Sequence, residues 1–139
     1  MTKNTLSPEL YRVIDANLNR LKEGVRVVED LMRYLHNNKE LSKKLKSIRH
    51  LALYEDIDAL LENRDSINDV LRPTVESELN RTDLKSIIVA NFKRAQESSR
   101  VLEELFKLHS AKESENFKHI RYELYDLEKE VIKTTSNSK

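Results

Sequence analysis

The chain has 139 residues, with one glycine, two prolines and no cysteine, and 35% of its residues are charged. Because turns between strands rely on glycine and proline, this composition favours long helices in a single domain, and it excludes disulfides and thiolate metal sites. The formal net charge is +1 and no apolar run is long enough to span a membrane, so we expect no nucleic-acid partner, no membrane partner and a cytoplasmic location.

The first helix is predicted to begin at Ser7-Pro8-Glu9, which supply a hydroxyl cap, a proline at the first position and an acidic first turn. Asn37-Asn38 should end it, because asparagine tolerates the left-handed backbone conformation. Between these points apolar residues recur at alternating spacings of four and three, which is typical of a helix that buries one stripe. The stripe comprises Ile14, Leu18, Leu21, Val25, Val28, Met32 and Leu35.

A second helix is expected over about 39–62, and it completes a first hairpin over about 7–62. Residues 63–81 lose helical periodicity and contain Pro73, so they should form the one long connection, with a short helix over 75–79. Connections of this length in compact domains are often functional. The apolar positions of the second helix are Leu41, Leu45, Ile48, Ala52, Ile57, Leu60 and Leu61.

Thr82-Asp83 can cap a third helix, and a fourth is expected over about 112–133. Together they form a second hairpin over about 82–134. The small polar residues 135–139 are expected to fray.

Both hairpins carry the motif Ala-Asn-x-x-Arg-x-x-Glu-x-x-Arg-Val-x-Glu when residues 14–35 are aligned with 88–109. Ile48-Arg49 similarly matches Ile120-Arg121 in the following helices. Amphipathic helices share apolar positions readily, but they need not share asparagine, arginine and glutamate, so duplication is favoured. We therefore expect an all-α bundle of four long antiparallel helices, built from two duplicated hairpins related by a pseudo-two-fold axis.

In an up-down-up-down bundle the first and third helices are parallel, so polar residues at matching positions of the two helices should lie at the same end. The long connection starts at that end as well. The residues expected there are Asn17, Arg20, Asn91 and Arg94 from the helices, and Arg64, Asp65 and Asp69 from the connection.

These residue types favour a pocket for an anionic ligand, because planar guanidinium groups suit phosphate and carboxylate. The alternative is a buried structural network, in which each polar group is paired. Arg49, facing the middle of the bundle, is a further candidate ligand for phosphate. Asp65 and Asp69 are the candidate catalytic residues, placed to hold Mg²⁺ or orient a hydroxyl, and the alternative for them is an ordinary turn cap.

The Glu-x-x-Arg part of the motif faces away from the stripe. It is expected to form either a solvated face with i,i+3 ion pairs or a homodimer interface. No Glu-x-x-His is present, which excludes the paired di-iron arrangement of helical bundles, and a single glycine excludes a glycine-rich phosphate loop. The residues concerned are Glu23, Arg26, Glu97 and Arg100.

Several blocks carry a family resemblance: residues 14–30, Ile48-Arg49-His50, residues 64–70, Glu78 with Arg81, and residues 90–104. In these blocks the chain resembles a small helical family of hydroxymethylpyrimidine-phosphate kinases from thiamin biosynthesis, a domain often fused ahead of thiamin-phosphate synthase. The resemblance implies phosphoryl transfer from ATP, with Mg²⁺, to hydroxymethylpyrimidine monophosphate.

Two other functions remain open on the residues alone. One is a non-catalytic helical module that binds a phosphorylated metabolite or a protein partner. The other is a structural bundle whose charged outer faces pair two copies of the chain.

Overall fold

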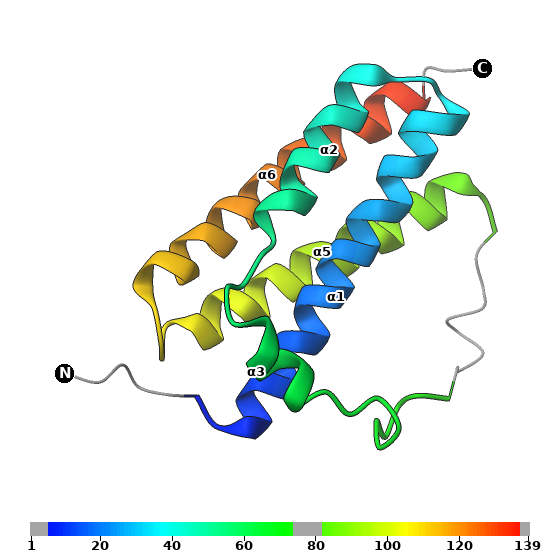
Figure 1. Cartoon of the computed structure of the whole chain (residues 1–139). Coiled ribbons are helices and arrows are strands. Elements are labelled where there is room, and N and C mark those ends of the chain that lie inside the picture. The colour runs from blue at the N-terminus through cyan, green and yellow to red at the C-terminus, as the bar shows by residue number, and fades with distance from the viewer. Residues whose placement is uncertain (1–5, 74–81, 137–139) are drawn as a thin grey trace.

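The computed structural model describes residues 6–73 and 82–136, and within these ranges the chain is helical and contains no strand. This confirms the all-α class. The short helix predicted over 75–79, and the motif residues Glu78 and Arg81, lie outside the described residues. The helical elements are α1 (Pro8–Asp30), η1 (Leu31–Leu35), α2 (Lys39–Leu51), α3 (Ile57–Glu62), α5 (Leu84–Phe106) and α6 (Ala111–Ser136) (Figure 1).

Three predicted helix starts are confirmed by their caps. The Ser7 hydroxyl accepts a hydrogen bond from the Leu10 amide at 3.3 Å, and the Asp83 carboxylate accepts one from the Ser86 amide at 2.8 Å. Asn37 has a φ of 52°, which reverses the chain after η1, and Asn38 then caps α2. At the other end of the chain, α6 continues to Ser136, so the prediction that residues 135 and 136 fray is wrong, and the rest of the predicted tail lies outside the described residues.

The second helix of the first hairpin is not continuous, and the prediction of one helix over 39–62 is wrong. α2 ends at Leu51, the chain bends at Ala52, and Asp56 caps the separate helix α3. The bend brings the Tyr54 ring within 5.2 Å of the Phe106 ring, measured between centroids. The break lets the partly buried Tyr54 ring pack against the buried Phe106 ring, a contact that helical periodicity alone does not predict. It also leaves Ile57 and Leu61, expected to be buried, largely exposed.

The apolar stripe of α1 ends earlier than predicted. Met32 is fully buried, but Leu35 is 52% exposed. The reason is a π-helical turn, η1, in which the His36 amide donates to the Leu31 carbonyl at 3.1 Å. A π turn contains more residues than an α turn, so it rotates Leu35 out of the stripe.

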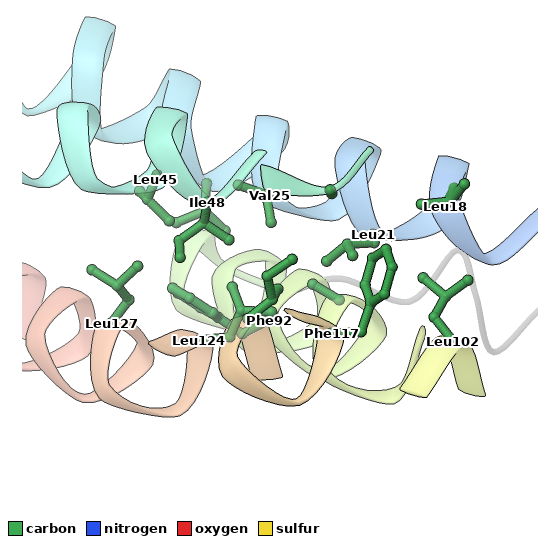
Figure 2. Packing of buried hydrophobic residues seen from close by; sticks show 14 of the residues in the cluster. Leu18, Leu21, Val25, Leu45, Ile48, Phe92, Leu102, Phe117, Leu124 and Leu127 are labelled. Carbon is green, nitrogen blue, oxygen red and sulfur yellow. The ribbon is translucent and has the colours of Figure 1, made fainter. Parts of the chain in front are cut away.

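The four long helices surround one core. α1 packs against α5 and α2, and α6 packs against α5 and α2, so α1 lies diagonal to α6 and α2 lies diagonal to α5. Figure 2 shows side chains from all four helices meeting between them, among them Leu21 and Val25 of α1, Ile48 of α2, Phe92 of α5 and Leu124 of α6.

The first and third long helices run antiparallel, so the expectation that they are parallel is wrong. Gly24 lies against Asn91 and Ala95, and Tyr54 lies between Tyr11 near the start of α1 and Phe106 at the end of α5. Accordingly, α5 begins at the end of the bundle where α1 finishes (Figure 1). A connection of about twenty residues can return along the bundle before the next helix begins, so it does not impose the up-down-up-down order.

Candidate functional site

A surface cleft of about 480 Å³ lies between the first half of α1 and the segment that follows α3. On α1 the lining residues run from Glu9 to Arg20 and include 12–13, 15–17 and 19–20, groups that follow one another by about one turn, so they lie along one side of the helix. Val13 and Ala16 form an apolar strip within this face. The cleft brings together five of the predicted site residues: Asn17, Arg20, Arg64, Asp65 and Asp69.

Two arginines fasten the segment after α3 to α1. Arg64 makes a bidentate ion pair with Asp15, in which Nε donates to Oδ2 at 2.7 Å and Nη2 donates to Oδ1 at 2.6 Å. This hydrogen bonding raises the pKa of Arg64. Nη2 of Arg12 donates to the Asp65 carbonyl oxygen at 2.8 Å. Arg64, predicted to bind phosphate, is therefore already neutralised by a carboxylate and shapes the wall of the cleft.

Asp15 was not among the predicted site residues, although it is 5% exposed and anchors Arg64. A signal for it was present in the sequence repeat. Its counterpart in the second hairpin is Val89, so the acidic residue at this position is specific to the first hairpin. A buried carboxylate needs a partner, and the connection supplies one.

The two candidate catalytic aspartates both accept hydrogen bonds within their own loop. Asp65 accepts from the Asn68 backbone amide at 3.1 Å and from the Asn68 side chain at 2.7 Å. These bonds to Asn68 are the main cause that lowers the pKa of Asp65, which is therefore ionised at neutral pH. Asp69 accepts from the Leu71 amide at 2.9 Å. Both contacts are those of turn-capping carboxylates, and each residue keeps a place in the cleft wall.

Three arginines line the cleft, and Arg12 and Arg64 are bonded to other residues as described above. Arg20 is exposed and makes no hydrogen bond or ion pair with another described residue. Its neighbour Asn17 is buried, and its side-chain amide donates to the Val13 carbonyl at 2.9 Å. That bond leaves the acceptor oxygen of Asn17 outside the contact. Arg20 is thus the side chain of this site best able to bind an incoming anion.

The second copy of the motif does not join this cleft. Asn91 lies at the level of Gly24, which is seven residues beyond Asn17, or about 10 Å along the helix. Its side-chain amide repeats the local bond, donating to the Ile87 carbonyl at 2.8 Å. Arg94 is exposed and is not among the lining residues. The antiparallel course of α5 therefore places the two Asn/Arg pairs on opposite sides of the midpoint of the α1–α5 contact.

Arg49, the remaining predicted phosphate ligand, is paired within the bundle. Its Nε donates to Glu29 at 2.7 Å and its Nη2 donates to the other carboxylate oxygen at 3.2 Å. Arg121 makes the equivalent contact in the second hairpin, where its Nε donates to Glu103 at 3.0 Å. Both pairs are largely buried and link the two helices of a hairpin. The shared glutamate of the motif is therefore a partner for the arginine of the next helix.

The outward residues of the motif are exposed, as expected, but their ion pairs have a different spacing. Arg26 pairs with Asp30 at 3.4 Å and Arg100 pairs with Glu104 at 3.3 Å, both at i,i+4. The homodimer interface remains a prediction for this face.

Within residues 6–73 and 82–136, no three histidine, aspartate or glutamate side chains are grouped so that they could hold a metal ion. Nor does any helix in these ranges have the length and apolarity that a membrane span requires.

The sequence profile of the ThiD2 family matches residues 12–130, a range that includes most of both hairpins and every lining residue of the cleft except Glu9. The chain belongs to the ThiD2 family. Among proteins similar to this ThiD2 chain is the Thiamine-phosphate synthase of Prochlorococcus marinus (strain AS9601), which is 34% identical over 132 residues, covering 94% of this chain and 38% of that protein.

The Thiamine-phosphate synthase of a Synechocystis species is 38% identical over 124 residues, covering 88% of this chain and 36% of that protein. The Nostoc punctiforme protein of the same name is 34% identical over 131 residues, covering 94% of this chain and 37% of its own length. The ThiD2 chain thus spans little more than a third of the curated relatives it matches. No solved structure shows significant similarity.

Proposed function

We propose that this chain transfers a phosphoryl group from ATP to hydroxymethylpyrimidine monophosphate, giving the diphosphate, in thiamin biosynthesis. Membership of the ThiD2 family and relatives named Thiamine-phosphate synthase support a role in that pathway. The name of those relatives describes proteins more than twice as long, so it does not transfer directly to this segment. The kinase reaction rests on the sequence blocks around Asn17 and Arg64, which form the cleft.

The observation that carries the proposal is a cation in the cleft wall that has no partner among the described residues. A substrate that already bears a phosphate needs a cationic anchor, and a guanidinium can offer two parallel N–H donors to it. Arg20 meets this requirement because no described carboxylate neutralises it. Arg64 fits it less well, because the bidentate contact with Asp15 already neutralises its charge and uses its Nε and one Nη2 donor. We assign Arg20 to the substrate phosphate and Arg64 to the shape of the cleft.

Phosphoryl transfer depends mainly on positioning and on neutralising charge, and Mg²⁺ usually supplies part of that neutralisation. In such sites one or two carboxylates and the phosphate oxygens of the nucleotide commonly hold the ion, with water. Asp65 and Asp69 fit the role of that small carboxylate set, since they line one cleft and Asp65 stays ionised. Their hydrogen bonds to the loop hold the carboxylates at fixed positions.

The direct test incubates the purified chain with ATP, Mg²⁺ and hydroxymethylpyrimidine monophosphate, and follows the pyrimidine diphosphate by chromatography and phosphorus NMR. We expect turnover that requires all three components. Absence of product when enzyme and substrate are equimolar would overturn the kinase proposal. Binding of the monophosphate without turnover would then favour the non-catalytic module.

The repeat offers a matched pair of variants for the anchor. Arg20→Ala removes a charge-assisted contact worth about 1.5–3 kcal/mol, so the KM for the pyrimidine monophosphate should rise by about tenfold to a hundredfold. Arg94→Ala changes the equivalent arginine, which is also exposed but lies outside the cleft, and should leave KM within about twofold of its original value. Equal increases of KM in the two variants would contradict the assignment of substrate binding to the cleft that contains Arg20. An unchanged KM in Arg20→Ala would show that Arg20 does not anchor the substrate phosphate.

A further inference from the structure

A second pocket, of about 310 Å³, lies where η1 leads into α2, at the end of α1 remote from the cleft. We propose that it is a binding site for a chain of linked phosphates. Its lining contains four cationic side chains, Arg33, Lys39, Lys43 and Lys46, and a single carboxylate, Glu29.

The charge of this pocket is not compensated within the described part of the chain. None of the three lysines makes an ion pair there, and the guanidinium carbon of Arg33 lies 4.9 Å from the centroid of the Tyr34 ring. Glu29 is already held by the bidentate contact with Arg49. The result is a local concentration of positive charge on a chain whose net charge is only +1.

A neighbouring lysine shows that α2 can pair its cations when carboxylates are near. Lys44 lies 3.5 Å from Glu40 and 3.2 Å from Glu130 of α6. Lys43, the preceding residue, lies on a different face of the helix and lines the pocket instead. Unpaired cations gathered in a concavity repel one another, and an anionic ligand relieves that repulsion.

The wall of the pocket is held by its own hydrogen bonds. The Asn38 side chain accepts from the Leu41 amide at 2.9 Å, and the Ser42 hydroxyl donates to the Asn38 carbonyl at 2.6 Å. The Leu41 amide is therefore not available to a ligand. The attraction of this pocket comes from its cationic side chains rather than from the start of α2.

The arrangement points to linked phosphates rather than to a single phosphate or a nucleic acid. A monophosphate has too little charge to satisfy four cations, whereas a triphosphate spreads its charge over several groups. The lining contains no aromatic ring on which a base could stack, so the phosphates themselves are the recognised part. A nucleoside triphosphate and inorganic tripolyphosphate share this chemistry.

This pocket is distinct from the proposed catalytic cleft. Arg33 follows Arg20 by thirteen residues, which corresponds to about 20 Å along a helix. A ligand anchored at Arg20 therefore does not reach the four cations, and the site adds a second anion-binding function to the chain.

Isothermal titration with tripolyphosphate, ATP and inorganic phosphate tests the proposal. The pocket variant is Lys39→Ala/Lys43→Ala/Lys46→Ala, and the matched control Lys85→Ala/Lys118→Ala/Lys129→Ala removes the same charge from exposed lysines elsewhere. We expect tripolyphosphate affinity to fall by at least about tenfold in the pocket variant and by less than about twofold in the control.

Comparison of the three ligands, and of the Arg20→Ala chain with the original chain, tests whether this pocket is the site that recognises linked phosphates. In the Arg20→Ala chain, tripolyphosphate should bind as it does to the original chain, since the pocket is intact. ATP affinity equal to that of tripolyphosphate indicates recognition of the phosphates alone, and inorganic phosphate should bind at least about tenfold more weakly. Equal losses in the pocket and control variants, unchanged binding in the pocket variant, or equally tight binding of inorganic phosphate would each overturn the proposal.

Discussion

Gly24 is a point at which α1 closely approaches α5, and replacing it tests the antiparallel contact directly. A Cβ atom added there would lie 2.9 Å from the backbone carbonyl oxygen of Asn91 and 3.5 Å from the Cβ of Ala95. The first distance is shorter than van der Waals contact, and its partner is helix backbone that cannot rotate away. Gly24→Ala should therefore push α1 and α5 apart by a few tenths of an ångström.

Two opposing effects set the magnitude. Helix propensity favours alanine over glycine by about 1 kcal/mol in a helix interior. Overfilling a well-packed contact costs about 1–3 kcal/mol, because neighbouring side chains must shift. The steric effect should win, giving a net loss of up to about 2 kcal/mol in the free energy of unfolding. Gly24→Val adds further volume and should lose more.

Urea denaturation followed by circular dichroism measures this loss as a lower midpoint with an unchanged slope. Ser98→Ala is the control, because Ser98 occupies the equivalent position of α5 and already carries a Cβ. It should change stability by no more than about 0.5 kcal/mol, in the direction of helix propensity. A gain of about 1 kcal/mol in Gly24→Ala would show that propensity acts alone and that the helices do not meet at this residue.

Three further outcomes follow from pairs of residues described above. Arg49→Met should destabilise the chain by about 3–5 kcal/mol, because it leaves Glu29 charged, unpaired and only 3% exposed. Glu29→Gln should cost less, since Arg49 can reach water. Equal losses of the two variants in urea denaturation would contradict this reasoning. Burial is the main cause that raises the pKa of Tyr54, so its phenol should stay protonated above pH of about 10. The stability that it contributes should be complete below that pH and be lost as the pH rises further. In an ultraviolet titration of the tyrosines, the step at the highest pH should vanish in Tyr54→Phe. Asp15→Asn should speed hydrogen exchange in residues 63–73 while α5 stays protected, and unchanged exchange would show that the ion pair does not hold that segment.

The helix boundaries that sequence reasoning placed well are those set by nearby residues. Ser7, Asn38 and Asp83 cap helices through hydrogen bonds to amides three positions away, so the signal lies within a few residues of the boundary. The periodic core of α1 follows from the same local rule until η1 begins. These features need no knowledge of what lies across the bundle.

The break between α2 and α3 has a cause that is remote in sequence. It allows Tyr54 to contact Phe106 from the second hairpin, and nothing in the apolar spacing around residue 54 requires that contact. A continuous helix satisfies the local pattern as well, so the choice between them depends on tertiary structure.

The candidate site was predicted where local connectivity determines it and not elsewhere. Asn17 and Arg20 share the cleft with residues 64–69 because α3 returns along α1 to its first half. The position of Asn91 depended on the direction of α5, which a long connection leaves open. The arginine at position 49 has the residue type of a phosphate ligand, but its partner Glu29 on the neighbouring helix could be recognised only from the geometry.

The antiparallel α1–α5 contact relates the two hairpins to each other as two subunits of a dimer are related. Two hairpins of similar sequence meet face to face in the manner of an isologous dimer, in which each surface patch would contact its own copy. In a true dimer of that kind both halves would be equivalent. Here a tether, the connection that begins at residue 63, follows the first hairpin alone. Arg64, Asp65 and Asp69 belong to that tether, so the cleft forms where the symmetry of the bundle is broken. Joining the two hairpins into a single chain thus gives one half a cleft that the described part of the other half does not repeat.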